Sequence, residues 1–395
     1  MHEIDIMDIG GFKIGQAEDT KGLTGCTVFL FDKQSPAGVD IRGGGPASRE
    51  TPLLNPVADA KGIHALVLSG GSAFGLDAAG GVMKYLEERD IGFDVGVTKV
   101  PLVVQSCIFD LVIGDKNARP DGKMAYKACE NASYDTFLQG NYGAGMGATV
   151  GKYMGRERSM KSGIGAYAVQ LGELKVGAVV TLNALGDIYD IDTDKKIAGA
   201  LDENGLLFDD ETAYFEAAAK IQNMFTGNTT IGTIITNAKL DKTALNKVAS
   251  MAHNGYGRAI RPVHTMADGD SIYAVSVGSV PADINLVGPM SAYVMAKAIA
   301  NAARSAKSVD GYKAFGFLPF SSGETGNTLA ITANQANRWT PREISGDAST
   351  ENPNAMFPRL SYGNDHNSTQ PSTFWKANVR YLRLQEINLN YNLSA

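Results

Sequence analysis

The chain has 395 residues, 44% of them hydrophobic, which is enough for a sizeable core in one large domain or two ordinary ones. Its formal net charge of −6 argues against a nucleic-acid partner, which needs a clustered basic face. No apolar run is long enough to span a membrane, and the first residues show no signal peptide, so we expect a cytoplasmic protein with no membrane partner for residues 1–320.

The first part of the chain alternates short apolar runs with glycine-rich turns. Residues 25–31 and 63–69 are predicted as buried strands, with residues 39–42 as the hairpin partner of the first. Three glycines at residues 43–45, followed by a proline, exclude a regular element there. Two interpretations stay open for this segment: a wide loop, or a pocket wall where the backbone approaches another group closely.

A glycine turn at Gly70 and Gly71 opens an amphipathic helix that reaches residue 89. Such a turn can bind phosphate at a helix N-terminus. The spacing is not G-x-G-x-x-G and no acidic residue follows at the right distance, so we do not expect a dinucleotide site. A further apolar segment covers residues 101–113, and a helix is predicted from residue 126.

Residues 140–151 (GNYGAGMGATVG) are too rich in glycine for a regular element. A flexible linker is one interpretation. We favour a packed loop, because apolar side chains are interspersed among the glycines. The main-chain N–H groups of Gly143 and Gly145 would then be candidates for an oxyanion site.

The second half of the chain again mixes strands and helices. Residues 177–186 are predicted as a buried strand with Asn183 near its end. The other predicted elements are a helix over 211–225, a strand over 227–236 with Asn228 at its mouth, a helix over 241–254 with Asp241 as N-cap, a strand over 271–277 and a helix over 289–307. Strands and paired helices without strict βαβ alternation indicate a layered sandwich with helices outside the sheets.

Thr265 lies in a loop just before the strand over 271–277, in which Ile272 and Ala274 face one side and Tyr273 and Val275 the other. A hydroxyl in the middle of a chain is an unusual nucleophile unless the chain is cut there. The three cysteines are odd in number and have no metal-like spacing, so we expect buried free thiols and identify no metal or cofactor site.

An ordered set of motifs along the chain resembles that of a known family. The motifs are RGGGPASRET (42–51), LSGGSAFGL (68–76), VP (100–101), IFDL (108–111), GNYGAGMG (140–147), NTT (228–230) and HTMADGD (264–270). Together they closely resemble the DmpA family of L-aminopeptidase/D-esterase peptidases, which also includes β-aminopeptidases and endo-type nylon-oligomer hydrolases. The resemblance covers roughly residues 4–318.

This resemblance implies an α/β (α+β) protein with the four-layer αββα sandwich of N-terminal-nucleophile-like hydrolases. It also implies an inactive precursor that cuts itself between His264 and Thr265 into an α chain, 1–264, and a β chain from residue 265. The freed α-amine of Thr265 could then serve as the base for its own hydroxyl. The expected substrates are short peptides, amino-acid amides or amide oligomers, and the expected assembly is a homo-oligomer, a tetramer by resemblance.

The resemblance assigns further residues to the site. Asn228 corresponds to the oxyanion-binding asparagine, Tyr142 to a tyrosine beside the glycine-rich loop, and Asn183 to a polar active-site position. On the helix after the nucleophile strand, Ser291 corresponds to a serine of the aminopeptidase members, whereas Tyr293 stands where a second acid is expected. We therefore leave the substrate class open. The glycines expected to form the pocket and oxyanion loop are Gly70, Gly71, Gly143 and Gly145.

Composition changes after about residue 320, where both tryptophans, Trp339 and Trp375, fall. Residues 321–395 resemble a fragment of a SusC-type TonB-dependent outer-membrane receptor, and we expect an unrelated, poorly packed tail behind a hydrolase domain at 1–320. Two other functions remain open for that domain. One is a non-catalytic or unprocessed homologue that binds a small molecule, and the other is an acyltransferase with the same nucleophile.

Overall fold

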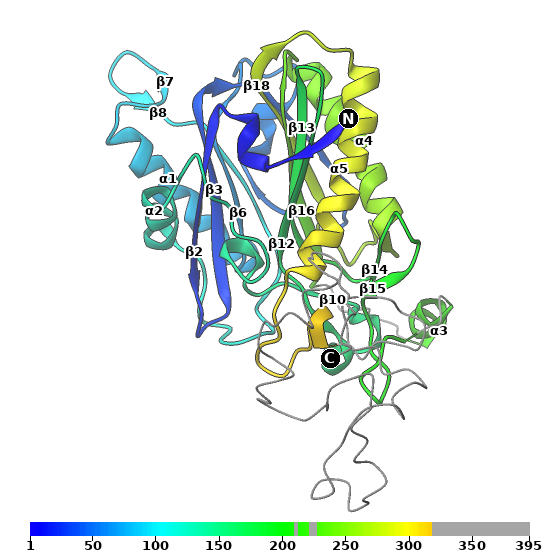
Figure 1. Ribbon diagram of the computed structural model, residues 1–395. Coiled ribbons are helices and arrows are strands. Elements are labelled where there is room, and N and C mark those ends of the chain that lie inside the picture. The colour runs from blue at the N-terminus through cyan, green and yellow to red at the C-terminus, as the bar shows by residue number, and fades with distance from the viewer. Residues whose placement is uncertain (209–211, 221–226, 318–395) are drawn as a thin grey trace, which may run out of the picture. The chain divides into compact units, whose positions relative to one another are not determined.

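The computed structural model describes residues 1–208, 212–220 and 227–317. The chain divides into two units, residues 1–318 and 319–395. The second unit, and with it the predicted tail over 321–395, lies outside the described residues. In the first unit two sheets lie face to face and helices cover their outer faces (Figure 1). Within the described residues, no helix is both long and apolar enough to cross a membrane.

Among the described residues the first sheet has six strands, in which the neighbouring strands β16 and β18 run parallel and the other pairs are antiparallel. In spatial order the strands are β1 (His2–Ile4), β12 (Ile164–Leu171), β13 (Leu174–Asn183), β16 (Thr229–Ala238), β18 (Ser271–Val280) and β4 (Ala37–Ile41).

The second sheet has five strands, in which only β6 and β9 run parallel. In spatial order they are β2 (Phe12–Asp19), β3 (Thr24–Ser35), β6 (Ile63–Ser69), β9 (Val103–Cys107) and β5 (Ala47–Arg49). Three small sheets are formed by β7 (Phe93–Asp94) with β8 (Lys99–Val100), by β10 (Thr149–Val150) with β11 (Met160–Lys161), and by β14 (Asp187–Tyr189) between β15 (Lys196–Ala198) and β17 (Ile260–Arg261).

Helices complete the four layers. Those outside the second sheet are α1 (Ala78–Glu87) and α2 (Gly122–Glu130), those outside the first are α4 (Lys242–Ala259) and α5 (Ile284–Arg304), and α3 (Ala213–Lys220) stands apart from these pairs. Asp241 caps α4 as predicted, because its side chain accepts a hydrogen bond from the N–H of Ala244 (2.8 Å). The predicted αββα sandwich is confirmed.

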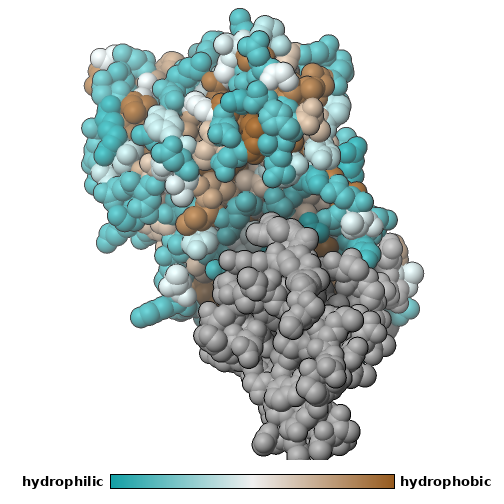
Figure 2. Space-filling model, viewed as in Figure 1, coloured by the Kyte–Doolittle hydropathy of each residue, from teal (hydrophilic) through white to brown (hydrophobic). Residues whose placement is uncertain are grey.

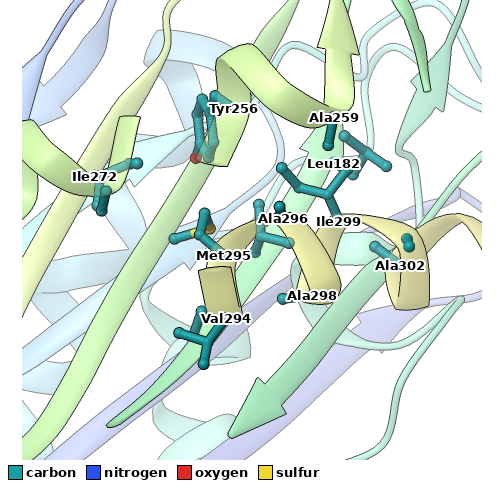
Figure 3. Packing of buried hydrophobic residues seen from close by; sticks show 14 of the residues in the cluster. Leu182, Tyr256, Ala259, Ile272, Val294, Met295, Ala296, Ala298, Ile299 and Ala302 are labelled. Atoms are coloured by element: carbon teal, nitrogen blue, oxygen red, sulfur yellow. The ribbon is translucent and has the colours of Figure 1, made fainter. Parts of the chain in front are cut away.

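The alternation along β18 explains why this strand is buried on both faces. Ile272 and Ala274 pack into the core between the first sheet and its helices, where Tyr256, Met295 and Ile299 lie (Figure 3). Tyr273 and Val275 point to the other face and join the core between the two sheets. Burial on both faces is expected of an interior strand that is covered by helices on one side and by a second sheet on the other. Hydrophilic side chains cover most of the visible surface of the described part (Figure 2).

Two predicted elements differ from the structure. Residues 39–42 do not form a hairpin with residues 25–31: β4 pairs with β18 in the first sheet, because the chain leaves the second sheet at Pro36. The helix expected to begin at Pro289 begins five residues earlier with α5, whose N-cap is Asp283. The three cysteines are buried free thiols, as predicted.

Candidate active site

Strand directions in the first sheet gather four segments at one edge. The parallel strands β16 and β18 both begin there, and the antiparallel strands β13 and β4 both end there. Asn183 at the end of β13 therefore lies opposite Thr229 at the start of β16. The loop before β18, which contains Thr265, lies at the same edge.

Thr265 is half-buried, and its hydroxyl is hydrogen-bonded on both sides. Oγ1 donates to Oδ2 of Asp268 (2.6 Å) and accepts from the N–H of Ala267 (3.1 Å). The N–H of Thr265 donates to the same carboxylate oxygen (3.1 Å). A carboxylate at this distance can take the proton of the hydroxyl, and it can also hold an amine formed at the same residue.

Asp268 forms a buried carboxylate pair with Asp270. Burial raises the pKa of Asp268, although the hydrogen bonds from Thr265 work against the rise. Burial also raises the pKa of Asp270, and repulsion from Asp268 adds to this. Oδ1 of Asp270 accepts from the N–H of Thr230 (2.8 Å) and Oδ2 from the N–H of His264 (3.1 Å). Proton affinity is therefore raised beside the predicted cleavage point, as is common at catalytic sites.

Lys152 is a further site residue, and sequence reasoning missed it. It follows the glycine-rich loop and is buried, and its Nζ donates to the carbonyl (2.9 Å) and to Oδ1 (2.7 Å) of Asn183. Burial lowers the pKa of Lys152 to about 7, against the attraction of Asp268 and Asp110. A lysine directly after a glycine loop was the one available signal. Asn183 thus lies at the edge of the site, where its two oxygens accept hydrogen bonds from the side-chain nitrogen of Lys152.

The lowered pKa of Lys152 predicts a pH dependence of stability. Between pH 7 and 10.5 this lysine is deprotonated in the folded chain and protonated in the unfolded one, so its contribution to stability rises with pH. We expect the free energy of unfolding of the wild type, minus that of Lys152→Met, to increase by at most about 1.4 kcal/mol per pH unit across this window. Urea unfolding at three pH values measures it. The exposed Lys61→Met is the control, and a difference as flat as that of the control would contradict the prediction.

Asn228 lies beside the loop that contains Thr265, as the oxyanion prediction requires. Its N–H (3.4 Å) and its Nδ2 (3.3 Å) both donate to the carbonyl of Ala267, and its own carbonyl accepts from Gly269 (3.0 Å). The side-chain amide therefore contacts the loop at Ala267, two residues after Thr265. Its role as an oxyanion donor stays a prediction.

The four glycines predicted as a pocket and oxyanion loop are closely packed, and their role in the site stays a prediction. Their N–H groups donate within the protein: Gly143 to Glu18 (2.6 Å), Gly145 to Tyr142 (2.9 Å), Gly70 to Gly25 (2.9 Å) and Gly71 to Asp110 (2.7 Å). Close packing explains why these positions are glycine. A Cβ at Gly70 would lie 1.9 Å from Oδ2 of Asp110, and one at Gly143 would lie 2.3 Å from Oγ1 of Thr27. The packed-loop interpretation is confirmed, and these amides are already engaged.

Glycines 43–45 lie against the loop that contains Thr265. The N–H of Gly44 donates to the carbonyl of Thr265 (3.3 Å), and that of Gly45 to the carbonyl of Asp268 (2.8 Å). A Cβ at Gly43 would lie 2.3 Å from the main-chain nitrogen of Asp270. Of the two interpretations of this segment, the structure therefore favours a wall that approaches another backbone closely.

Two further predicted site residues, Ser291 and Tyr142, lie in α5 and in the glycine-rich loop. Ser291 is buried within α5 and its hydroxyl donates to the carbonyl of Val287 one turn earlier (2.7 Å), so its catalytic role stays a prediction. The part of α5 that meets the glycine-rich loop is its end, where a Cβ at Gly140 would lie 2.2 Å from the carbonyl of Ser305. Tyr142 is half-buried in that loop, and its catalytic role stays a prediction.

Known proteins are similar to this chain in sequence and in fold. An uncharacterized aminopeptidase of Mycobacterium leprae is 34% identical over 354 residues, which cover 81% of this chain and 96% of that protein. The 6-aminohexanoate-oligomer endohydrolase of Agromyces sp. is 33% identical over 278 residues, 69% of this chain and 75% of that protein.

Among solved structures, the L-aminopeptidase D-Ala-esterase/amidase of Ochrobactrum anthropi superposes with a TM-score of 0.59 at 16% identity, over 78% of this chain and 89% of that one. Its description as a variant of the Ntn-hydrolase fold agrees with the two facing sheets described above. The sequence profile of peptidase family S58 matches residues 5–315. The chain therefore belongs to peptidase family S58, the DmpA family of hydrolases.

Proposed function

We propose that this hydrolase is made as a precursor that cuts its own His264–Thr265 bond and then uses Thr265 to hydrolyse amide bonds. The observation that carries the proposal is the 2.6 Å hydrogen bond from the Thr265 hydroxyl to the buried carboxylate of Asp268. The same carboxylate oxygen accepts the N–H of Thr265, the group that becomes an amine after cleavage.

Self-cleavage would begin with attack of Oγ1 of Thr265 on the carbonyl carbon of His264. The acyl group moves from nitrogen to oxygen, the C–N bond breaks, and the nitrogen of Thr265 receives the proton. Water then hydrolyses the ester, which leaves a carboxylate on His264 and a free amine on Thr265. Asp268 touches both atoms that exchange the proton.

Substrate hydrolysis would repeat these steps on an external amide. Oγ1 of Thr265 attacks the carbonyl while its proton passes to the amine or to Asp268, and the proton then goes to the leaving amine. The side-chain amide of Asn228 would donate to the oxyanion. Water releases the acyl group from Thr265. In its protonated form, which its lowered pKa restricts to about pH 7 and below, Lys152 lowers the pKa of Asp268 and would help keep this carboxylate ionised.

The proposed substrates are amino-acid amides, short peptides and amide oligomers, in line with the printed names of the relatives. The test is a panel of α- and β-amino-acid p-nitroanilides and one 6-aminohexanoate oligomer, with the Thr265→Ala chain as blank. Hydrolysis of at least one compound above this blank is expected. Turnover that needs an added acceptor amine would identify an acyltransferase, and no turnover by intact protein would identify a binding homologue. Light scattering tests the homo-oligomer that the family resemblance implies.

We also propose that residues 321–395 are dispensable for this function, since the family profile ends at residue 315. A chain that ends before residue 335 should fold, cut itself and hydrolyse substrate at rates within about twofold of the full chain. Circular dichroism and the substrate panel measure this. Loss of folding or activity on truncation would show that the tail belongs to the enzyme.

A further inference from the structure

The residue before the predicted cleavage point contacts a second histidine. Nε2 of His264 lies 2.8 Å from Nδ1 of His253, a buried residue of α4, and Nε2 of His253 lies 2.9 Å from the carbonyl oxygen of Asp40. A carbonyl only accepts, so Nε2 of His253 must carry a hydrogen and, in the neutral ring, Nδ1 must accept. His264 is therefore the Nε2–H tautomer, and its ring donates to His253.

The backbone of His264 is held as well. Its φ is +60°, in the left-handed region that side-chain-bearing residues seldom occupy. Its N–H donates to Oδ2 of the buried Asp270 (3.1 Å), and the ring of Tyr256 stacks on its imidazole with centroids 5.9 Å apart. A residue in a sparsely populated conformation keeps it only when its surroundings impose it.

Building on the proposed function, we infer that His253 is a positioning residue for self-cleavage, which fixes His264 on the acyl side of the His264–Thr265 bond. On the other side, the carbonyl of Thr265 is held by Gly44 and its hydroxyl by Asp268. The residues on the two sides of the His264–Thr265 bond are thus held by contacts with different parts of the chain. His253 acts through His264 and has no need to touch a substrate.

The cut itself separates this role from substrate turnover. Once the bond is broken, His264 is the end of the first chain and is no longer linked to Thr265. Its conformation then cannot strain or direct the nucleophile through a shared peptide bond. Loss of the contact should therefore slow self-cleavage and leave the turnover of the mature enzyme almost unchanged.

The contact also depends on charge. Burial lowers the pKa of both His253 and His264 to about 4, and Arg42 opposes protonation of both, whereas Asp40 favours it. Asp270, 4.0 Å from Nε2 of His264, faces the pair as well, and Tyr256 is packed against both rings. A proton on Nδ1 of His253 would turn the acceptor into a donor, so self-cleavage should slow as the pH falls toward 4.

The test compares His253→Leu with His253→Asn. Oδ1 of an asparagine lies near the position of the histidine Nδ1 and can accept from His264, whereas leucine cannot. On denaturing gels of freshly made protein, His253→Leu should process about tenfold more slowly than wild type and His253→Asn within about threefold. Per cut chain, kcat/KM of all three should agree within about threefold.

The remaining outcomes of this test decide whether His253 positions His264. Wild-type processing speed in His253→Leu would overturn the inference, as would equal slowing in the asparagine variant. If His253→Leu does not fold by circular dichroism, His264→Phe removes the same hydrogen bond from the loop side. It should slow processing about tenfold, and a wild-type rate would overturn the inference. A wild-type chain that never processes would instead contradict the proposed function.

Discussion

The Thr265→Ala chain should remain intact at 395 residues, whereas the wild type should give fragments of 264 and 131 residues (395 − 264) on a denaturing gel. Alanine lacks the oxygen that attacks the His264 carbonyl, so neither self-cleavage nor acyl transfer can begin. We expect the hydrolytic rate to fall by roughly 10⁴-fold or more, as when other covalent hydrolases lose their nucleophile.

The matched control is Thr265→Ser, which keeps the hydroxyl and the bond to Asp268. This variant should cut itself and retain measurable activity. Both variants should fold, because the main-chain hydrogen bond from residue 265 to Asp268 does not need the side chain. Fragments from the alanine variant, or their absence from the wild type, would show that Thr265 is not the nucleophile.

Removing the charge of Asp268 should have the second largest effect. Asp268→Asn keeps the size of the side chain but cannot take a proton from Thr265. We expect self-cleavage and kcat/KM to fall by about 10²- to 10⁴-fold, the usual range for a lost general base. Time courses on denaturing gels and assays on the fraction that is cut measure the two effects separately.

An exposed carboxylate provides the control for this variant. Asp59 pairs only with the exposed Lys61 among the described contacts, and Asp59→Asn should behave like wild type. The pH profile gives a second readout. With Asp268 neutral, the buried Lys152 loses an attractive charge, so its pKa should fall further and any limb of the profile due to it should move to lower pH. Wild-type rates in Asp268→Asn would show that the carboxylate only fills space.

Local signals predicted much of this molecule. Period-two alternation identified both faces of β18, and a capping residue identified the start of α4. The partner of residues 39–42 was mispredicted, because the chain changes sheets at Pro36 and strand pairing between sheets has no local signal. Hairpin pairing is the usual expectation for strands so close in sequence.

Candidate site residues could be predicted from the sequence where they lie in dense motifs. They could not be predicted where only the burial of a side chain distinguishes a site residue from a surface residue. The ordered motifs predict Thr265 and Asn228 as site residues, and the structure places the two on neighbouring segments, while their catalytic roles stay predictions. Lys152 was missed because a single lysine looks like a surface residue until its burial is known. Ser291 was aligned along α5, whose many small residues resemble one another at several registers, so its role stays a prediction.

The place of β18 between β16 and β4 has a consequence for the mature enzyme. If the bond before Thr265 is cut, β18 and α5 belong to one fragment, while both neighbouring strands and α4 belong to the other. The two fragments would then be held together without a covalent link, and their separation would leave open strand edges. Refolding would then require the association of two fragments. Recovery from denaturation should therefore depend on protein concentration in the processed form and not in the Thr265→Ala precursor.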